Sequence, residues 1–284
     1  MRNLAWLCFY LMLGLAIAIL MLWGFSVWTA IIVALLLVCP LIMIWGAIKV
    51  MRHPAELPLE PAPETRGMSL NWIAPFYDWL CSRFGLGVSF RKETLRFAAL
   101  QAGEMILDVG CGTGVLTRMA AEAVGPSGNA IGIDPAPKMI GLARKNAAFL
   151  SNKAEFRLAV IEDLPFKNET FDAVLSSAMI HHLPPDLKHI GLLEVKRVLK
   201  PGGRLVVVDI DRPDNPLWWF LVWPLRIMIT TCDHLAGRLD FYFREAGFDP
   251  VNRVGSWRGL LSFWLAYKPK NRSTRETINN RRVK

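Results

Sequence analysis

The sequence has few cysteines and none of the spacings with which cysteines usually build a site. Its five cysteines, among 284 residues, include no CxxC pair, and two of them fall within a long apolar segment. Disulfide frameworks and structural zinc sites depend on closely grouped cysteines, so the sequence argues against both. We therefore expect no metal, and we expect reduced thiols, as in a cytoplasmic environment.

Charge is absent from a long stretch near the N-terminus. No Asp, Glu, Lys or Arg occurs between Arg2 and Lys49. Because a transmembrane helix needs about 20 apolar residues, this stretch has room for two. The natural turn lies at Phe25 and its two neighbours, which predicts spans near 4–23 and 27–48. Four tryptophans fall near the proposed span ends, where aromatic belts sit.

Positive charge flanks this hairpin on both sides, whereas its turn carries none. Arg2 precedes the first span, and Lys49 and Arg52 follow the second. The positive-inside bias therefore places the N-terminus and the rest of the chain on the cytoplasmic side. A cleaved signal peptide and a hairpin that enters one leaflet are the alternatives. The missing small-residue cleavage site and the immediate second span favour a retained hairpin, with the lipid bilayer as a partner.

The net charge of +9 is concentrated at the C-terminal end of the sequence. Between Lys268 and Lys284 there are seven Lys or Arg residues and one Glu. This tail is either a solvated end or a segment attracted to anionic lipid headgroups, at about 1 kcal/mol per basic residue. Nucleic acid is not an expected partner, because the basic residues are not interleaved with aromatic ones.

Strand and helix patterns alternate after a proline-rich stretch. Strands are expected at 105–109, 130–134, 155–160, 171–177, 203–210, 249–255 and 260–267, and helices at 114–124, 137–149 and 186–199, with another ending near Gly247. Such alternation predicts βαβ units around a parallel sheet. The expected organisation is a transmembrane hairpin (1–51), a linker (52–68), an α/β domain (69–268) and a basic tail (269–284).

Residues 106–114, ILDVGCGTG, place an acid and a glycine turn at the end of an apolar strand. The spacing G-x-G-x-G differs from the G-x-G-x-x-G of a dinucleotide site. Asp108 would repel a pyrophosphate but could pair with an ammonium group. Asp134 ends the next strand, where an acid can bind two ribose hydroxyls. The predicted ligand is therefore a nucleoside with a cationic amino-acid end.

These motifs, taken in order, resemble those of class I S-adenosylmethionine-dependent methyltransferases. The matching segments are ILDVGCGTG (106–114), GIDPAPKMI (132–140), EDLPF (162–166), FDAVLSSAMIHHLP (171–184) and VLKPGGRLVVVD (198–209). The nearest resemblance is to the group that contains the ubiquinone and menaquinone C-methyltransferases. It implies a Rossmann-like α/β fold with a seven-stranded sheet of order 3-2-1-4-5-7-6, preceded here by the two membrane helices, and S-adenosyl-L-methionine as cofactor.

The resemblance also implies which residues bind that cofactor. Asp108 and the glycine turn would line its methionine end, Asp134 its ribose, and Pro135 and Met139 its adenine. The remaining residues of the implied set are Gly110, Cys111, Gly112, Thr113, Gly114, Ile161, Glu162 and Ser177. A redox role is the alternative for the cysteine in the turn, where a small side chain also suits tight packing.

Two further features of the sequence bear on how the sulfonium and the adenine of the cofactor would be bound. NWIAPFYDWL (71–80) looks like the cofactor-capping helix of the same group, and its Tyr77 is a candidate for cation–π contact with the sulfonium. Val160 stands where the family often has an Asp that reaches the adenine amino group. The backbone N–H of Ile161 is then left to contact the adenine ring.

The acceptor side of the site is less defined by the sequence. A general base is needed only if the acceptor must lose a proton. His181 and His182 follow the fourth strand and could supply that base, although a structural role is the alternative. Asp209 and Asp211 end the next strand and could hold the acceptor, with helix capping or solvent exposure as the alternative.

Two absences narrow the choice of acceptor. No (N/D)PPY-like segment follows the fourth strand, which disfavours a nucleobase amine. The Arg-Asn pair usual in quinone-type enzymes is replaced by MIHH (179–182), which puts quinone C-methylation in doubt. We therefore expect O- or N-methylation of a lipophilic small molecule or lipid. A quinone C-methyltransferase, a non-catalytic membrane adaptor and an NAD-dependent oxidoreductase are the alternatives.

The aromatic run NPLWWFLVWP (215–224) follows the fifth strand. It could be a third membrane span, ordinary core, or an interfacial element that covers the acceptor pocket. Pro224 and Arg226 interrupt the apolar stretch, which is shorter than a span requires. We expect the interfacial element, with Trp218 and Trp219 near both substrate and bilayer. Full burial of these tryptophans against the sheet would contradict that expectation.

Overall fold

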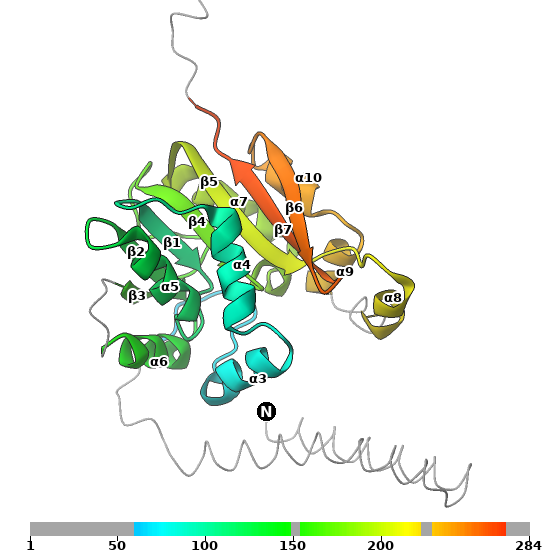
Figure 1. Ribbon diagram of the computed structural model, residues 1–284, viewed down its shortest axis with the longest axis horizontal. Helices are drawn as coiled ribbons and strands as arrows, with labels where there is room; N and C mark the ends of the chain where they lie inside the picture. Colours follow the sequence, from blue (N-terminus) through cyan, green and yellow to red (C-terminus); the bar gives the residue numbers. More distant parts are fainter. Residues whose placement is uncertain (1–59, 149–153, 223–228, 271–284) are drawn as a thin grey trace, which may run out of the picture. The chain divides into compact units, whose positions relative to one another are not determined.

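The computed structural model describes residues 60–148, 154–222 and 229–270. Within them, seven strands form one sheet of order β3-β2-β1-β4-β5-β7-β6, which confirms the predicted order (Figure 1). The strands are β1 (Met105–Val109), β2 (Asn129–Asp134), β3 (Ala154–Leu158), β4 (Phe171–Ser177), β5 (Leu199–Ile210), β6 (Val251–Trp257) and β7 (Leu261–Tyr267). β7 pairs antiparallel with both β5 and β6, and the other pairings are parallel.

Helices cover both faces of this sheet (Figure 1). They are η1 (Ala74–Phe76), α3 (Tyr77–Arg83), α4 (Val88–Ala98), α5 (Val115–Val124), α6 (Pro137–Ala147), η2 (Ile180–His182), α7 (Pro185–Val198), α8 (Pro216–Val222), α9 (Ile229–Leu235) and α10 (Leu239–Glu245). In β1, Ile106 packs with α4 and α5, whereas Leu107 packs with α7 and α10. The central strands are therefore buried on both faces, which explains their continuous apolar runs.

The predicted elements match the observed ones closely, with two helices omitted. β1 and β4 have the predicted bounds, and β5 begins at Leu199, four residues before the predicted 203–210. The helices over Val88–Ala98 and Ile229–Leu235 were not predicted. The first buries Phe90, Thr94 and Ala98 at intervals of four residues, but one of the three is polar and another is small, so the apolar pattern is weak in the sequence.

The predicted hairpin, with spans near 4–23 and 27–48, lies outside the described residues, as does the tail from residue 271. None of the helices described is both long enough and apolar enough to cross a bilayer. The aromatic run forms α8, seven residues long, before residues 223–228, which are not described. Trp218 and Trp219 are half-buried, and Trp218 packs close to Gly259 in the β6–β7 turn.

Candidate functional site

The glycine turn connects β1 to α5 and is anchored on β2. The backbone N–H groups of Gly110 and Cys111 both donate to the carbonyl of Ile133 at 2.9 Å. Gly114 caps α5 at φ 77°, and a Cβ there would come within 2.4 Å of the Phe156 ring. This close approach requires glycine and brings the turn against a side chain of β3.

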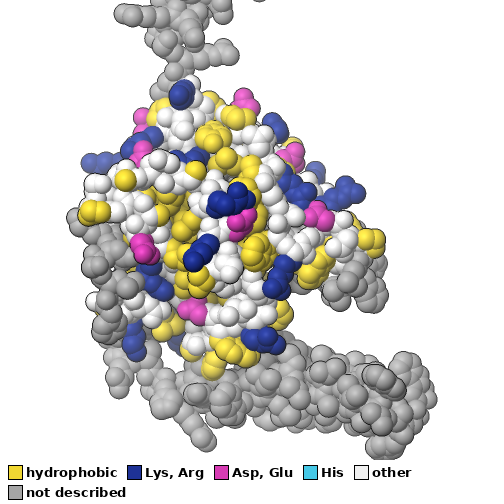
Figure 2. Space-filling view, viewed as in Figure 1, with side chains coloured by type: hydrophobic (Ala, Val, Ile, Leu, Met, Phe, Trp, Pro, Cys, Tyr) yellow, Lys and Arg dark blue, Asp and Glu magenta, His cyan; other side chains and the backbone are white. Residues whose placement is uncertain are grey.

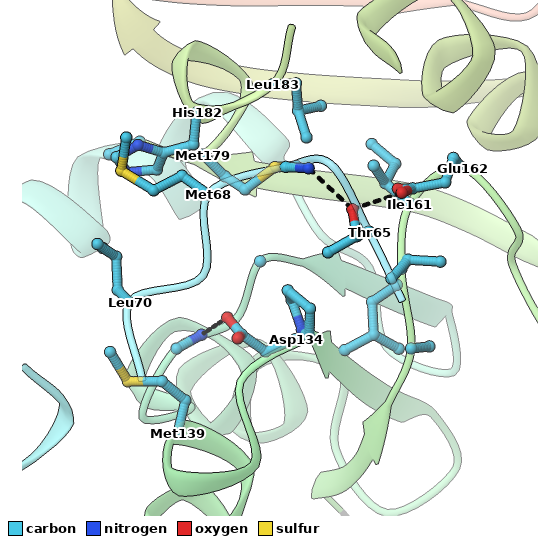
Figure 3. Close-up of a pocket in the computed structure, with 18 of the residues that line it drawn as sticks. Thr65, Met68, Leu70, Asp134, Met139, Ile161, Glu162, Met179, His182 and Leu183 are labelled. Atoms are coloured by element: carbon cyan, nitrogen blue, oxygen red, sulfur yellow. Dashed lines mark hydrogen bonds between the residues drawn. The ribbon is translucent and has the colours of Figure 1, made fainter. Parts of the chain in front are cut away.

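A pocket opens at the carboxyl ends of the central strands, above this turn (Figure 3). The space between its lining residues is about 660 Å³ and is open to solvent. Seven residues of the predicted cofactor set line it: Gly110, Gly112, Asp134, Pro135, Met139, Ile161 and Glu162. We call this the nucleoside pocket, since the residues expected around ribose and adenine gather there.

Asp134 is fixed at the floor of the nucleoside pocket by two backbone donors. Its Oδ2 accepts from the N–H of Gly112 at 3.0 Å, and its Oδ1 accepts from the N–H of Ala136 at 2.8 Å. Each oxygen retains a second lone pair, so the carboxylate can still accept from a pair of vicinal hydroxyls. This arrangement fits the ribose of S-adenosylmethionine.

A second pocket adjoins the first. The two share Tyr77, Gly110 and Ala178. The second is lined in addition by Asp108, Cys111 and Ser177 of the predicted set, and by Cys81, Leu86, Phe90, Arg91 and Leu116. We call it the methionine pocket, because the residues expected at the amino-acid end of the cofactor meet there.

Burial sets the charge state of the carboxyl groups in both pockets. Burial raises the pKa of Asp108 to about 6, although a hydrogen bond from the Thr117 hydroxyl at 2.6 Å acts to lower it. Burial also raises the pKa of Asp134 to about 6, although the hydrogen bonds from the two backbone N–H groups act to lower it. A buried carboxylate that lacks full compensation favours a cationic or hydroxyl-bearing ligand. The residues present therefore fit the ammonium and ribose groups of S-adenosylmethionine.

The other members of the predicted cofactor set have different surroundings. The hydroxyl of Thr113 donates to Asp78 on α3 at 2.6 Å, which ties the turn to the capping helix, and neither pocket is lined by it or by Gly114. Burial, together with Asp108 and Asp134, raises the pKa of the Cys111 thiol. A protonated, buried thiol is inert, so the redox alternative loses its chemical basis.

The two histidines after β4 differ in position. His182 lines the nucleoside pocket, and burial lowers its pKa to about 4, so its ring is neutral at pH 7. His181 does not line either pocket; its Nδ1 lies 2.5 Å from Oδ1 of Asp209. The two imidazole rings are 3.9 Å apart between centroids. A buried carboxylate therefore orients one histidine, whose ring contacts, at a tilt, the ring of the histidine in the pocket.

Both aspartates predicted to hold an acceptor are buried and engaged within the protein. Burial would raise the pKa of Asp209, but His181 outweighs it and the pKa lies below its usual range. Asp211 accepts from the indole N–H of Trp264 at 3.1 Å. Neither these residues nor Trp218 and Trp219 line the two pockets. Their proposed contact with the acceptor stays a prediction.

The N-terminal side of the site includes a segment expected to be linker. Thr65 donates to Oε1 of Glu162 at 2.5 Å, and the N–H of Met68 donates to the carbonyl of His182 at 3.1 Å. Thr65, Gly67 and Met68 line the nucleoside pocket (Figure 3). The proline content of residues 52–68 predicted a linker. Only the tertiary contacts show that the second half of this segment lies across the site.

Sequence reasoning also missed a buried ion pair behind the histidines. Lys188 of α7 is fully buried, and its Nζ lies 3.0 Å from Oδ1 of Asp233 on α9. Tyr242 donates to the same carboxylate. Nothing in the sequence pairs a lysine with an aspartate 45 residues away. In the described ranges, no group of three or more His, Cys, Asp or Glu could hold a metal.

This sheet order, with a glycine turn and two carboxylates at the ends of β1 and β2, defines the class I methyltransferase fold. Residues 106–203 match the family model described as a methyltransferase domain. A crystal structure of an S-adenosylmethionine-dependent methyltransferase from Methanosarcina mazei has the same fold. The TM-score is 0.52 at 23% identity, with 62% of this chain and 98% of that one covered.

Curated relatives agree with this class. The demethylmenaquinone methyltransferase of Lactobacillus johnsonii is 36% identical over 149 residues, which is 51% of this chain and 60% of that protein. An arsenite methyltransferase of Halobacterium salinarum is 40% identical over 127 residues, 44% of this chain and 31% of that protein. The chain thus spans less than two thirds of the length of these relatives. Residues 106–203 therefore match a methyltransferase domain, on the fold of S-adenosylmethionine-dependent methyltransferases.

The raised pKa values of Asp108 and Asp134 predict how cofactor affinity depends on pH. Both carboxyls are predicted to bind the cofactor in their ionised form, so protonation below about pH 6 should compete with binding. Between pH 7 and pH 5, the dissociation constant for S-adenosylmethionine should rise about tenfold for each group and about 100-fold for both. Isothermal titration calorimetry at several pH values measures this change.

Methylthioadenosine, which lacks the amino-acid end, provides the control for that measurement. It engages only the nucleoside pocket, so its dissociation constant should rise about tenfold over the same range. A dissociation constant for S-adenosylmethionine that is the same at pH 5 and pH 7 would contradict these roles of the two carboxyls.

Proposed function

We propose that the chain is an active S-adenosylmethionine-dependent methyltransferase, anchored in a membrane, that acts on a lipophilic small molecule or lipid. The observation that carries the proposal is the pair of adjoining pockets, with Asp134 in one and Asp108 in the other. Bound S-adenosylmethionine supplies an activated methyl group. The residues of the chain then need only to bind the two reactants, orient them and exclude water from the site. These effects can supply most of the rate gain.

Exposed apolar side chains beside the site support a lipophilic acceptor. On and beside the capping helix α3, the most exposed large apolar residues are Trp72 (49%), Trp79 (58%), Phe84 (66%) and Val88 (57%). Figure 2 shows apolar side chains at the lower end of the domain, where Figure 1 draws α3. Tryptophans suit the headgroup level of a bilayer.

The proposed anchor is the uncharged apolar segment before Lys49, as two spans with the domain on the cytoplasmic side. The basic residues from Lys268 to Lys284 would add attraction to anionic lipid. An acceptor dissolved in the membrane would then enter beside α3. The bilayer is thus proposed as both partner and substrate reservoir.

O- or N-methylation is favoured because the site contains a candidate proton acceptor. A neutral His182 lines the pocket and contacts the ring of His181, which Asp209 orients. A second candidate function is C-methylation of a quinone-type acceptor, supported by the 36% identity to a demethylmenaquinone methyltransferase. An acceptor that loses a proton is common to both reactions.

The experiment supplies the full chain in membranes with S-adenosylmethionine carrying a radiolabelled methyl group. Membrane lipid extract and purified demethylmenaquinone are offered as separate acceptors. Label that enters the organic phase from lipid extract supports the first function, and preferential labelling of demethylmenaquinone supports the second. Cofactor binding without label in either would favour a non-catalytic adaptor and would refute the proposal.

Replacing Asp209 with asparagine should lower kcat by about 10- to 100-fold. The carboxylate of Asp209 accepts from Nδ1–H of His181, whereas the amide N–H of asparagine can donate to an unprotonated Nδ1. The substitution therefore favours the tautomer of His181 that carries its proton on Nε2, and part of the gain from base catalysis is lost. The cofactor dissociation constant should change less than about threefold, because Asp209 lines neither pocket. Single-turnover kinetics and calorimetry separate the two effects.

Asp214 provides the matched control for this variant. It pairs with Arg253 on the surface, so Asp214→Asn should leave kcat unchanged. A purely structural role for Asp209 would appear as a lower melting temperature of Asp209→Asn with an unaltered kcat for the folded fraction. That outcome would remove the histidine pair from the proposed chemistry.

A further inference from the structure

The segment from α3 to the start of α4 has two sides with different surroundings. On its outer side, Trp79 and Phe84 are each more than half exposed. On its inner side, Tyr77, Cys81 and Leu86 line the methionine pocket. A helix is only about 10 Å across, so whatever covers the outer side of this wall lies close to the site.

Two further segments extend the outer side of this wall. The indole N–H of Trp257 donates to the carbonyl of Gly85 at 3.0 Å, and the Arg258 side chain packs against the same glycine. Trp218 of α8 packs against Gly259 in the same β6–β7 turn. In Figure 1, α3 and α8 lie at the lower side of the domain with this turn between them. We call residues 72–92, 216–222 and 257–260 the docking surface.

The charge of the docking surface is mostly positive. It contains four basic residues and one acid, Asp78, which already accepts from the glycine turn. Arg83, Lys92 and Arg258 are exposed, and within the described ranges none of the three forms an ion pair. Figure 2 shows basic side chains among apolar ones on this side of the domain. The surface is therefore both apolar and cationic.

An anionic bilayer is the partner that suits both properties. Tryptophans sit at the headgroup level, and aromatic side chains combined with basic ones are typical of interfacial elements. Each basic residue near an anionic leaflet strengthens attraction about fivefold. The sequence points to the same partner independently, because no charged residue occurs between Arg2 and Lys49.

We propose that the docking surface binds an anionic bilayer and turns the wall of the methionine pocket toward the lipid. The inference rests on the proposed function, which supplies the membrane anchor, and it deepens that function. A tether alone keeps the domain near the bilayer without selecting the face that meets it. The docking surface selects that face, so a lipophilic acceptor leaves the lipid beside the reactive end of the cofactor.

The test uses the full chain reconstituted in phosphatidylcholine vesicles, with or without phosphatidylglycerol. The photo-crosslinking amino acid benzoylphenylalanine replaces Trp79 in one protein and Phe241 in another. Phe241 is the matched control, because it is a half-exposed aromatic on α10, which Figure 1 draws at the upper side of the domain. With phosphatidylglycerol present, position 79 should crosslink to lipid and position 241 should not.

The contribution of charge is measured with Arg83→Gln/Lys92→Gln/Arg258→Gln, again with the crosslinker at position 79. The yield of lipid crosslinks gives the ratio of docked to undocked protein. On vesicles with phosphatidylglycerol this ratio should fall by about 100-fold, which is about fivefold for each basic residue. On phosphatidylcholine alone the substitutions should have no effect, because there is no net charge to attract.

A second triple variant, Lys167→Gln/Lys196→Gln/Arg244→Gln, is the control for net charge. These residues lie where the chain approaches β4, β5 and β6, at the edge of the sheet opposite the pockets. The ratio of docked to undocked protein should stay unchanged in this variant. An equal fall in the two triple variants would overturn the role of the basic residues in the docking surface.

The outcomes separate this inference from the proposed function. Crosslinks from position 79 to a second copy of the chain, or no crosslinks at all, would overturn the docking surface. Methyl transfer to lipid extract is measured separately and would still support the proposed function in either case. Lipid crosslinks from position 79 without methyl transfer would support the docking surface and refute the function. A chain recovered free of vesicles would refute the membrane anchor and the docking surface together.

Discussion

Asp134→Ala should weaken the binding of S-adenosylmethionine by about 100-fold to 10,000-fold. The carboxylate is placed to accept from both ribose hydroxyls, and hydrogen bonds to a charged group contribute about 1.5 to 3 kcal/mol each. It also accepts from the N–H groups of Gly112 and Ala136, which position the glycine turn and the start of α6. Calorimetry with S-adenosylmethionine and with methylthioadenosine should show similar losses, because both ligands carry the ribose.

The loss should not come from unfolding. Burial raises the pKa of Asp134 to about 6, so at pH 7 the free protein holds this group ionised at some cost in stability. Removing it should therefore shift the melting temperature by only a few degrees. Glu122→Ala, on the exposed side of α5, is the matched control and should leave the affinity unchanged. A folded Asp134→Ala protein with unaltered affinity would refute the assignment of the ribose site.

The sequence predicted the sheet because its central strands are buried on both faces. Strands such as Met105–Val109 and Phe171–Ser177 must then be continuous apolar runs, which are visible without a structure. The acids near the ends of β1 and β2 were placed by the same logic, since the carboxyl ends of parallel strands meet at one edge. Asp108 and Asp134 accordingly face adjoining pockets.

What the sequence did not predict depends on contacts between distant segments. Arg91 lies on a helix with a weak apolar pattern, so neither the helix nor its place beside Asp108 was visible. Asp209 was a candidate to hold the acceptor, and the sequence did not show that its carboxylate would bond to His181. Position at a strand end indicates which edge a side chain lies on but not which neighbour it bonds. The membrane hairpin remains a prediction from the absence of charge.

Lys188→Met should lower the free energy of unfolding by about 3 to 5 kcal/mol. Lys188 is fully buried and lies within 3.1 Å of both carboxylate oxygens of Asp233. Tyr242 and Lys188 outweigh burial and keep the pKa of Asp233 below its usual range, so this acid stays ionised at pH 7. Removing the lysine leaves a buried carboxylate without a countercharge, which is strongly destabilising. Urea unfolding of the full chain, followed by tryptophan fluorescence, measures the loss.

The double variant Lys188→Met/Asp233→Asn distinguishes the charge from the packing of the lysine stem. It removes both charges and keeps an acceptor for the Tyr242 hydroxyl, so it should recover most of the stability lost in Lys188→Met. Lys196→Met, half-exposed on the same helix, should change the stability by less than about 0.5 kcal/mol. If the double variant is no more stable than Lys188→Met, the cost lies in lost packing and not in an unpaired charge. Since α7 begins at Pro185, close to His182, cofactor affinity can also be measured on the double variant. If its stability is recovered, that affinity shows whether cofactor binding depends on the ion pair itself or only on the fold that the ion pair supports.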